Sequence, residues 1–165
     1  MAKPLFGAVA LQHHGYVRHT EDIDILITPE GLDRFHACLV GRGYLPRFSG
    51  SRKKIRETTR HVDIDLFAAG ERGGPEALGF VFPDPRGEGF LEVEGLRFPD
   101  LAMLVTLKLV SGAAPHRLKD LADVLELIKA IGLDESLADR LLPALRAKYL
   151  ELLQAARQEP DPNSD

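Results

Sequence analysis

The sequence predicts an α/β fold, α+β in some schemes, in which a small mixed, twisted sheet is flanked by helices and the C-terminal portion is helical. Two observations lead to this prediction. Segments 22–27 and 61–67 alternate apolar and polar residues, with the period of two that is typical of half-buried strands. Beyond residue 100 the apolar residues recur with helical spacing instead.

Size and composition favour one domain. The chain has 165 residues, of which 44% are hydrophobic, which is enough for a core. We expect a single domain over 1–158, with a sheet-containing core over 1–100 and a helical part over 100–158. The polar, Pro-rich stretch 159–165 is expected to be a disordered tail.

Charge and hydropathy narrow the class of protein. A formal charge of −4 argues against binding nucleic acid through the overall field, so any site for a polyanion should be local. No signal-peptide pattern and no apolar run near the roughly 20 residues of a membrane span is visible. One cysteine, Cys38, excludes an intrachain disulfide and is expected in the core. We therefore expect a cytoplasmic protein without a membrane partner.

The first half of the chain predicts strands around one helix. Residues 3–6 form a short strand, and a short helix over 8–14 ends at Gly15. After the strand 22–27, Thr28 caps a helix that starts with Pro29 and runs up to Gly41. Extended segments are expected at 44–47 and 54–58, before the strand 61–67.

The second half is expected to change from loop to helix. Segment 68–89 is rich in Gly and Pro and predicts irregular loop, and Glu94-Gly95 predicts the turn of a hairpin between 90–93 and 96–98. Helices should follow over 100–111 and 116–130, and a further segment should start at Asp134. Pro143 predicts a break, after which the last helix runs to about Arg157. The expected apolar face of helix 116–130 consists of Leu118, Leu121, Leu125 and Ile128.

Four aspartates lie on the two alternating strands. In each of the pairs Asp22/Asp24 and Asp63/Asp65 the strand period places both carboxylates on one face, with Ile or Val on the other. Aspartate is disfavoured in strands, so four of them suggest a bound cation that offsets their repulsion. Magnesium suits such carboxylates when water and phosphates complete its ligands, and a third acid allows a second ion. The alternative is a set of solvated acids or a purely structural cation site.

The spacing of these motifs resembles a known family. The run GAVAL at 7–11 is followed by HGYVRHTEDIDIL at 14–26, and farther on by LVTLKLV at 104–110 and RLKDLAD at 117–123. This pattern resembles the minimal nucleotidyltransferases of the polymerase-beta superfamily, in particular the AbiEii-like toxin branch, also described as MNT-type. In that superfamily a glycine motif at a helix start precedes a D-x-D strand and a third acid on a neighbouring strand. Ala8 stands here in place of the usual second Gly or Ser.

The resemblance implies a set of site residues. Gly7 and Ala8 would contact phosphates through their amides, as anions do at a helix N-terminus. Asp22 and Asp24 would bind metal, and Asp65 would be the third acid. Asp63 remains an alternative because it shares the face of Asp65, although Leu66 and Phe67 after Asp65 match the family pattern better. Asp22, Asp24 and Asp65 would also carry catalysis.

Three further residues are candidates for nucleotide binding. Arg18 and Thr20 stand just before the D-x-D strand, where a guanidinium could reach phosphate oxygens; otherwise Arg18 pairs with the aspartates. Lys108, inside an apolar helix, either points toward the phosphates or is a surface lysine. Arg117, Lys119, Asp120 and Asp123 ordinarily indicate a salt-bridged solvent face, and any functional role for them rests on the resemblance.

The basic stretch 47–60 allows two interpretations. Its six cations could guide an acidic acceptor such as RNA, or they could protect an edge strand against aggregation. These cations are Arg47, Arg52, Lys53, Lys54, Arg56 and Arg60. Four histidines, His13, His14, His61 and His116, lack the spacing of a zinc site and are assigned structural or solvent roles.

The expected function is magnesium-dependent transfer of a nucleoside monophosphate from a triphosphate, such as ATP, to a hydroxyl. The acceptor could be RNA or tRNA, a protein or a small molecule, in a toxin–antitoxin setting. Two Mg²⁺ ions could take part, and the protein could have a protein partner or form a homodimer. The alternative function is a catalytically silent binding module that keeps the fold and acts through a protein partner.

Overall fold

Seven strands form one mixed sheet in the computed structural model, which describes residues 3–6, 14–15 and 22–158. The order across the sheet is β3-β4-β5-β2-β1-β7-β6. Parallel pairing joins β2 to β5 and β1 to β7, while the other neighbours are antiparallel. The strands are β1 (Lys3–Phe6), β2 (Asp22–Ile27), β3 (Tyr44–Pro46), β4 (Lys54–Glu57), β5 (Asp63–Ala68), β6 (Phe90–Val93) and β7 (Leu96–Pro99). The predicted fold class is confirmed.

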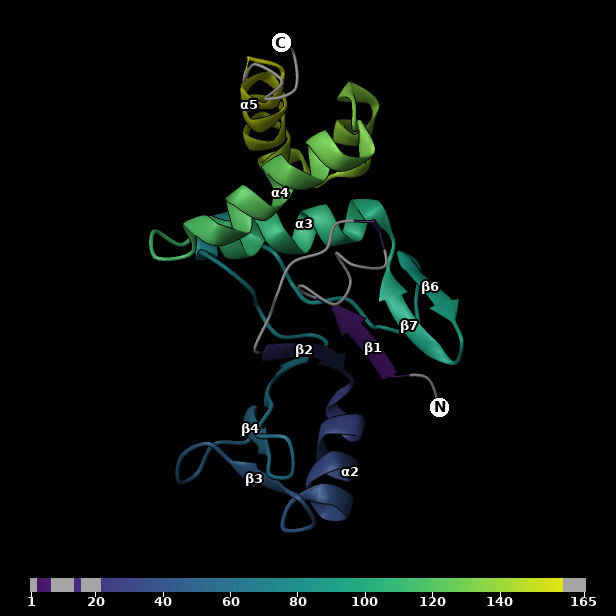
Figure 1. Cartoon of the computed structure of the whole chain (residues 1–165), viewed down its shortest axis with the longest axis vertical. Helices are drawn as coiled ribbons and strands as arrows, with labels where there is room; N and C mark the ends of the chain where they lie inside the picture. The colour runs from purple at the N-terminus through teal and green to yellow at the C-terminus, as the bar shows by residue number, and fades with distance from the viewer. Residues whose placement is uncertain (1–2, 7–13, 16–21, 159–165) are drawn as a thin grey trace.

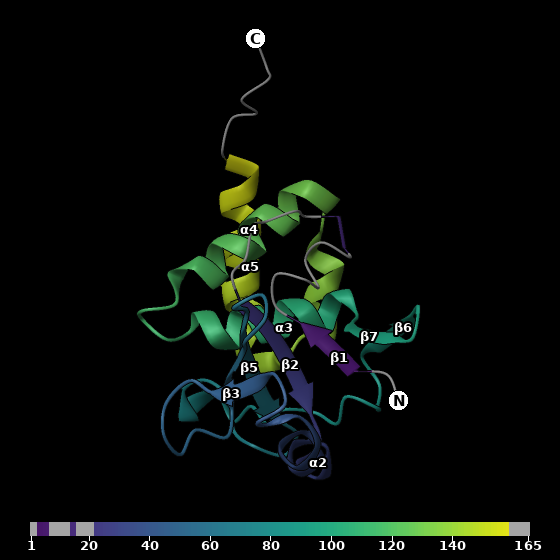
Figure 2. The same cartoon turned by 60° about the horizontal axis from the view of Figure 1, so that its bottom comes forward.

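Helices lie on both sides of the sheet (Figure 1). Helix α2 (Pro29–Leu39) lies on one side, with β3 and β4 beside it, and the helices after residue 100 gather on the other. These are α3 (Leu101–Gly112), α4 (Leu118–Ile131) and α5 (Pro143–Gln158). Two 3-10 helices are also present: η1 (Glu76–Leu78) lies between β5 and β6, and η2 (Glu135–Arg140) lies between α4 and α5. Figure 2 shows the same separation, with α2 at one end of the molecule and α4 and α5 toward the other.

Two hydrophobic clusters lie on the two sides of β5. Ile64 and Leu66 pack with Leu32 and Phe35 of α2, whereas Phe67 packs against the larger cluster formed mainly by α3, α4 and α5. The alternation of the strand explains this division, since successive side chains point to opposite faces. The face of Phe67, which is also the face of Asp63 and Asp65, is therefore turned toward α3.

Helix ends follow the expected local chemistry. Thr28 caps α2, with its Oγ1 accepting a hydrogen bond from the Gly31 amide at 3.1 Å. Asp100 caps α3 through the Met103 amide at 2.8 Å. The predicted break at Pro143 is confirmed, because η2 ends at Arg140 and α5 begins at the proline.

The hairpin and the loop before it also agree with the sequence. Glu94 and Gly95 have φ angles of 51° and 77°, and two positive φ angles define the tight hairpin turn that was predicted between β6 and β7. Segment 69–89 is largely irregular, with η1 and one isolated bridge between Arg72 and Val81.

The buried face of α4 differs from the predicted one. Leu118 is 67% exposed, so the predicted stripe is wrong at its first residue. The buried residues of α4 are Asp120, Asp123, Val124, Leu127 and Ile128. The buried face differs because Lys108 of α3 is itself buried and pairs with Asp120 and Asp123, so these two acids of α4 lie in the helix interface.

Cys38 was expected in the core but is exposed on α2. Cys38 follows Phe35 by three residues, but on α2 only Leu32 and Phe35 are buried. Of the helices in the described residues, none combines the length and the apolar character needed to cross a membrane.

Candidate active site

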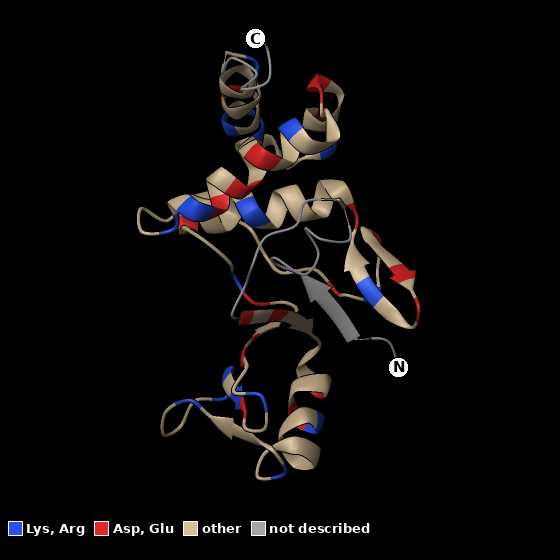
Figure 3. Cartoon of the chain, viewed as in Figure 1, with Lys and Arg blue, Asp and Glu red and all other residues tan. Residues whose placement is uncertain are grey.

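The four aspartates form two lateral pairs on adjacent parallel strands. In the register between β2 and β5, Asp22 stands beside Asp63 and Asp24 beside Asp65. Residues in register on neighbouring strands point to the same face, and the strands are about 4.8 Å apart. The carboxylates therefore share the face toward α3, with Asp24 and Asp65 one strand spacing apart. Figure 3 shows the acidic band on β2 below the basic and acidic residues of α3 and α4.

Asp24 is the most strongly perturbed of these acids. Burial raises its pKa from the usual 3.8 to about 6, and the negative charge of Asp65 adds to the rise. Lys108 and Arg117 act in the opposite direction, because their positive charges favour the ionised carboxylate. An acid whose pKa lies about two units above its usual value and that faces two cations is a typical feature of a functional site.

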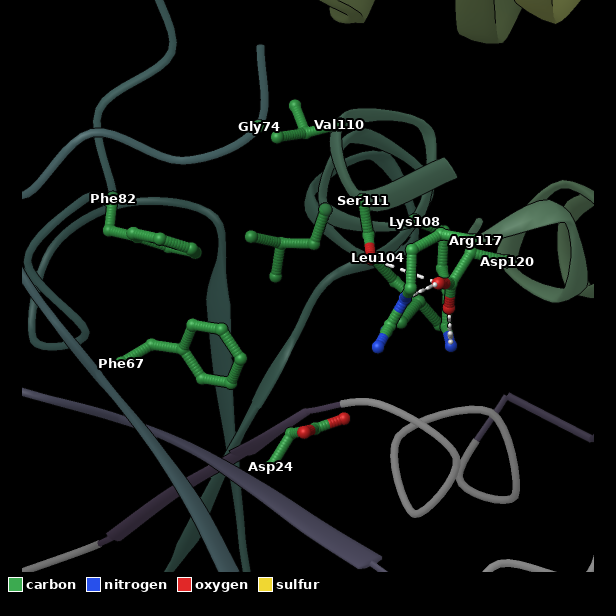
Figure 4. Close-up of a pocket in the computed structure, with 11 residues that line it drawn as sticks. Asp24, Phe67, Gly74, Phe82, Leu104, Lys108, Val110, Ser111, Arg117 and Asp120 are labelled. Carbon is green, nitrogen blue, oxygen red and sulfur yellow. Dashed lines mark hydrogen bonds and ion pairs between the residues drawn. The ribbon is translucent and has the colours of Figure 1, made fainter. Parts of the chain in front are cut away.

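A cavity of about 100 Å³ lies between Asp24 and the helices α3 and α4. Asp24 enters it from β2, while Lys108, Ser111, Arg117 and Asp120 line the opposite wall (Figure 4). The aromatic rings of Phe67 and Phe82 close one flank, with their centroids 5.2 Å apart. Its volume is below the 300 to 1,000 Å³ of usual ligand pockets, so within the described residues it fits a phosphate group rather than a whole nucleotide.

Lys108 links α3 to α4 at the wall of this cavity. Its Nζ donates to Asp120 Oδ1 and to Asp123 Oδ2, each at 2.8 Å, and the three side chains are at most 8% exposed. The alternative of a surface lysine is therefore wrong. The interpretation of Asp120 and Asp123 as members of a solvent face is wrong as well, since both carboxylates are buried to satisfy Lys108.

Asp120 is held ionised by a cluster of donors. Burial alone would raise the pKa of Asp120, but Lys108, Arg117 and Ser111 together hold it below its usual value. Arg117 Nε donates to Asp120 Oδ2 at 2.7 Å and Ser111 Oγ donates to the same oxygen at 2.9 Å. The cluster therefore fixes the cations of Lys108 and Arg117 opposite Asp24.

Cations from β4, and Arg47 directly after β3, already contact the acids of β5. Asp63 accepts from Arg56 Nε at 2.6 Å and pairs with Arg47 Nη2 at 3.2 Å, and the hydrogen bond from Arg56 lowers the pKa of Asp63. Lys54 donates to Asp65 Oδ2. Asp63 and Asp65 thus differ in their surroundings: two arginines hold Asp63, whereas Asp65 keeps one oxygen for another partner.

Most cations of the basic stretch 47–60 are therefore already paired with acids. Arg52 pairs with Asp33 of α2, and Lys53 pairs with Glu71, in addition to the pairs with Asp63 and Asp65. These acids lie 7 to 19 residues from their partners in the sequence, and they meet them only through the packing of α2 and the strands. The idea of a protected edge also needs correction, since β3 is the edge strand and β4 lies inside the sheet.

The acids fit a magnesium ion by the chemistry of their surroundings. Among the described residues, no group of three His, Cys, Asp or Glu side chains could hold a metal ion. A magnesium ion needs only one or two carboxylates, however, when water and phosphates complete its ligands. Asp65 Oδ1 is buried and has no hydrogen-bond partner in the described structure. Asp24, beside Asp65 in register, has a raised pKa because its ionised form is disfavoured by burial. A cation between them would satisfy both.

Several predicted site residues lie outside the described residues. Gly7, Ala8, Arg18 and Thr20 belong to this group, as do most of the predicted helix 8–14 and the tail 159–165. Of the candidates for nucleotide binding, Lys108 is described, and it lines the same cavity as Asp24.

Sequence reasoning missed Ser111 and the aromatic flank of Phe67 and Phe82. Ser111 follows Lys108 by three residues on α3, so helical spacing could have placed it beside the lysine. Phe67 was available from the alternation of β5, since it shares the face of Asp65. No pattern in the sequence of the loop indicates that Phe82 lines the cavity.

The comparisons with known proteins give a structural likeness only. No protein-family model matches the chain, and no curated protein matches it. A crystal structure of a candidate nucleotidyltransferase from H. pylori is similar, with a TM-score of 0.51 and 18% sequence identity. The match covers 95% of this chain and 85% of that one. At this identity the likeness supports the nucleotidyltransferase-like fold.

Proposed function

We propose that the protein is a magnesium-dependent nucleotidyltransferase that transfers a nucleoside monophosphate from a triphosphate to a hydroxyl. The observation that carries the proposal is that Asp24, in register with Asp65 on the adjacent parallel strand, faces Lys108 and Arg117 across a cavity. The carboxylate of Asp24 on the sheet side and the two cations on the helical side, which Asp120 holds in place, provide for a metal-bound polyphosphate.

Asp24 and Asp65 would hold the metal, with water and phosphates completing its ligands and Asp63 kept in place by its arginines. The role of Asp22 as a metal ligand rests on the family resemblance. Bound magnesium would neutralise charge on the triphosphate and on the departing pyrophosphate. Asp65 would accept the proton of the acceptor hydroxyl, while the hydroxyl oxygen forms a bond to the α-phosphorus and the bond to the departing pyrophosphate breaks. Positioning and charge neutralisation supply most of the rate enhancement in such transfers.

Lys108 and Arg117 would contact phosphate oxygens from the helical wall. Their alignment is fixed in advance, because Asp120 and Asp123 hold Lys108 and Asp120 holds Arg117. Gly7, Ala8, Arg18 and Thr20 would complete the phosphate contacts, a role that rests on the family resemblance. The resemblance also favours the AbiEii-like branch, a cytoplasmic toxin–antitoxin setting, and an acceptor that is RNA, protein or a small molecule.

A second candidate is a catalytically silent module that acts through a protein partner. The observation that favours it is the occupation of Asp65 by Lys54 and of Asp63 by two arginines. In that arrangement the protein's own cations replace the metal, and the acids become structural.

Calorimetric titration separates the two candidates. ATP, GTP, CTP and UTP with magnesium are titrated into the wild-type protein, into the double variant Asp22→Asn/Asp24→Asn and into Asp33→Asn. Asp33 is a matched control because it is an exposed acid on α2, on the opposite side of the sheet. We expect magnesium-dependent binding of at least one triphosphate by wild type and Asp33→Asn, and its loss in the double variant.

Absence of binding to all four triphosphates by folded wild-type protein would refute the transferase and leave the silent module. If binding occurs, transfer is followed with α-labelled triphosphate and separate RNA, protein and small-molecule acceptors. Labelled acceptor that forms with wild type and not with the double variant establishes the reaction.

A further inference from the structure

A second and larger cavity lies on the opposite side of the sheet from the aspartates. Its volume is about 420 Å³, within the range of small-molecule pockets and about four times that of the cavity at Asp24. It lies between α2, the strands β2 and β5, and the β6–β7 hairpin with residues 85–86. The apolar part of its wall is formed by Ile25, Ile27, Phe35, Leu39, Leu66 and Pro85.

Arginines line the same cavity. Arg86 is committed to Asp84, since its Nε and Nη2 donate to both carboxylate oxygens at 2.6 to 3.2 Å. Arg97 differs, because its Nε is buried and has no acceptor among the described residues. Arg34 of α2 is the third arginine of the wall.

The unsatisfied nitrogen of Arg97 is the observation that indicates a ligand. A buried donor without an acceptor is rare in folded proteins, and the charge makes the loss larger. Glu92 stands opposite Arg97 in the β6–β7 ladder and also lines the cavity, and Asp84 lies near enough to feel its charge. No ion pair joins Arg97 to either acid within the described part of the chain, so the guanidinium lacks the two-point partner that it favours.

We propose that this cavity is a second binding site, for a small amphipathic organic anion. The anionic group would accept hydrogen bonds from Arg97, and Arg34 would add positive charge. The apolar body would lie against Ile25, Phe35 and Leu66. The site is separate from the aspartates, so the proposal stands whether or not nucleotide transfer occurs.

The position of Cys38 gives a direct test. It is the only cysteine in the chain, it is exposed, and it lines this cavity. Alkylation by iodoacetamide, followed by intact-mass measurement, therefore reports occupancy of the cavity in the unmodified protein. The probe is 1-anilinonaphthalene-8-sulfonate, an aromatic body with one sulfonate, and its neutral counterpart is N-phenyl-1-naphthylamine.

We expect the sulfonate probe to bind with a stoichiometry of one and to slow alkylation of Cys38 at least fivefold at saturation. The neutral counterpart should bind about tenfold more weakly, because it makes no charged hydrogen bond with Arg97. Arg97→Met should remove this preference while thermal unfolding shows an intact fold. Arg72→Met is the matched control, since Arg72 is exposed and pairs with Glu76 away from the cavity.

Two results would overturn the proposal. One is a rate of Cys38 alkylation that does not change when the sulfonate probe is saturating. The other is equal affinity for the charged and neutral probes together with no effect of Arg97→Met. If Arg97→Met fails to fold, Arg34→Met and the comparison of the two probes on wild-type protein decide the matter.

Discussion

Replacing Asp24 by asparagine should stabilise the protein in the absence of metal. Burial removes water from the Asp24 carboxylate and costs free energy when the group is ionised. For this reason its pKa rises from 3.8 to about 6. Each pKa unit corresponds to about 1.4 kcal/mol of difference between the two protonation states, so the cost at neutral pH is about 3 kcal/mol. Asparagine keeps the shape and removes the charge, and should recover most of this free energy.

The sign of the pH dependence follows from the direction of the shift. Below about pH 3.8 the carboxyl is protonated in both folded and unfolded chains, and its charge costs nothing. As the pH rises toward 6 the unfolded chain releases this proton first, so the stability of the wild-type protein falls. Above about pH 6 the full cost is present and the difference between wild type and Asp24→Asn is largest.

Urea unfolding in EDTA measures this difference. At pH 7.5 we expect Asp24→Asn to exceed wild type by about 3 kcal/mol, and at pH 4.5 by about 1 kcal/mol. Asp22→Asn is the matched control, since it makes the same change two residues earlier on β2, where the side chain is exposed. It should change the free energy of unfolding by less than about 0.5 kcal/mol.

A destabilised Asp24→Asn protein, or a gain that is the same at both pH values, would refute the reasoning. The first outcome would mean that the carboxylate is stabilised by the cations of α3 and α4 more than burial disfavours it. The second would mean that the effect of the substitution does not come from the charge.

Three further substitutions test the helical wall and the C-terminal helix. Lys108→Met leaves two buried carboxylates without their cation and should cost about 3 to 5 kcal/mol in urea unfolding at pH 7.5; a cost below about 1 kcal/mol would show that the pair is solvated. Gly112→Ala places a methyl group where Leu121 Cδ2 lies 2.5 Å away, so we expect a loss of about 1 to 3 kcal/mol by thermal unfolding, and an unchanged midpoint would contradict the close helix contact. Tyr149→Phe removes the 2.7 Å hydrogen bond to the Asp134 carbonyl and should cost about 1 kcal/mol in urea, whereas a neutral result would mean that water replaces the hydroxyl.

Much of the sheet could be predicted from local pattern alone. The alternation over β2 and β5 predicts which side chains face the core, and it places Asp22 with Asp24 on one face of β2 and Asp63 with Asp65 on one face of β5. The parallel register that brings Asp24 beside Asp65 does not follow from the alternation. Turn chemistry was equally informative at Glu94-Gly95, because a tight hairpin turn needs the positive φ angles that glycine favours.

The surroundings of the acids could not be predicted in the same way. Lys108 on α3 meets acids of α4, and Lys54 on β4 meets Asp65 on β5, through pairings that depend on how helices and strands dock. The buried face of α4 was misplaced for this reason: leucine spacing suggested one stripe, whereas the charge of Lys108 selected the neighbouring one. Burial of a polar residue depends on its partner, and the partner is distant in the sequence.

The two-sided packing of β2 and β5 has a consequence for mutagenesis. Ile64 lies between Asp63 and Asp65 but packs under α2, so a change of volume there is transmitted through the strand backbone to both acids. For the proposed transferase, random mutagenesis that selects for altered transfer should therefore recover substitutions of residues that pack under α2, on the face of the sheet away from the aspartates. Such positions would show that the packing of β2 and β5 against α2 sets the spacing of the aspartates.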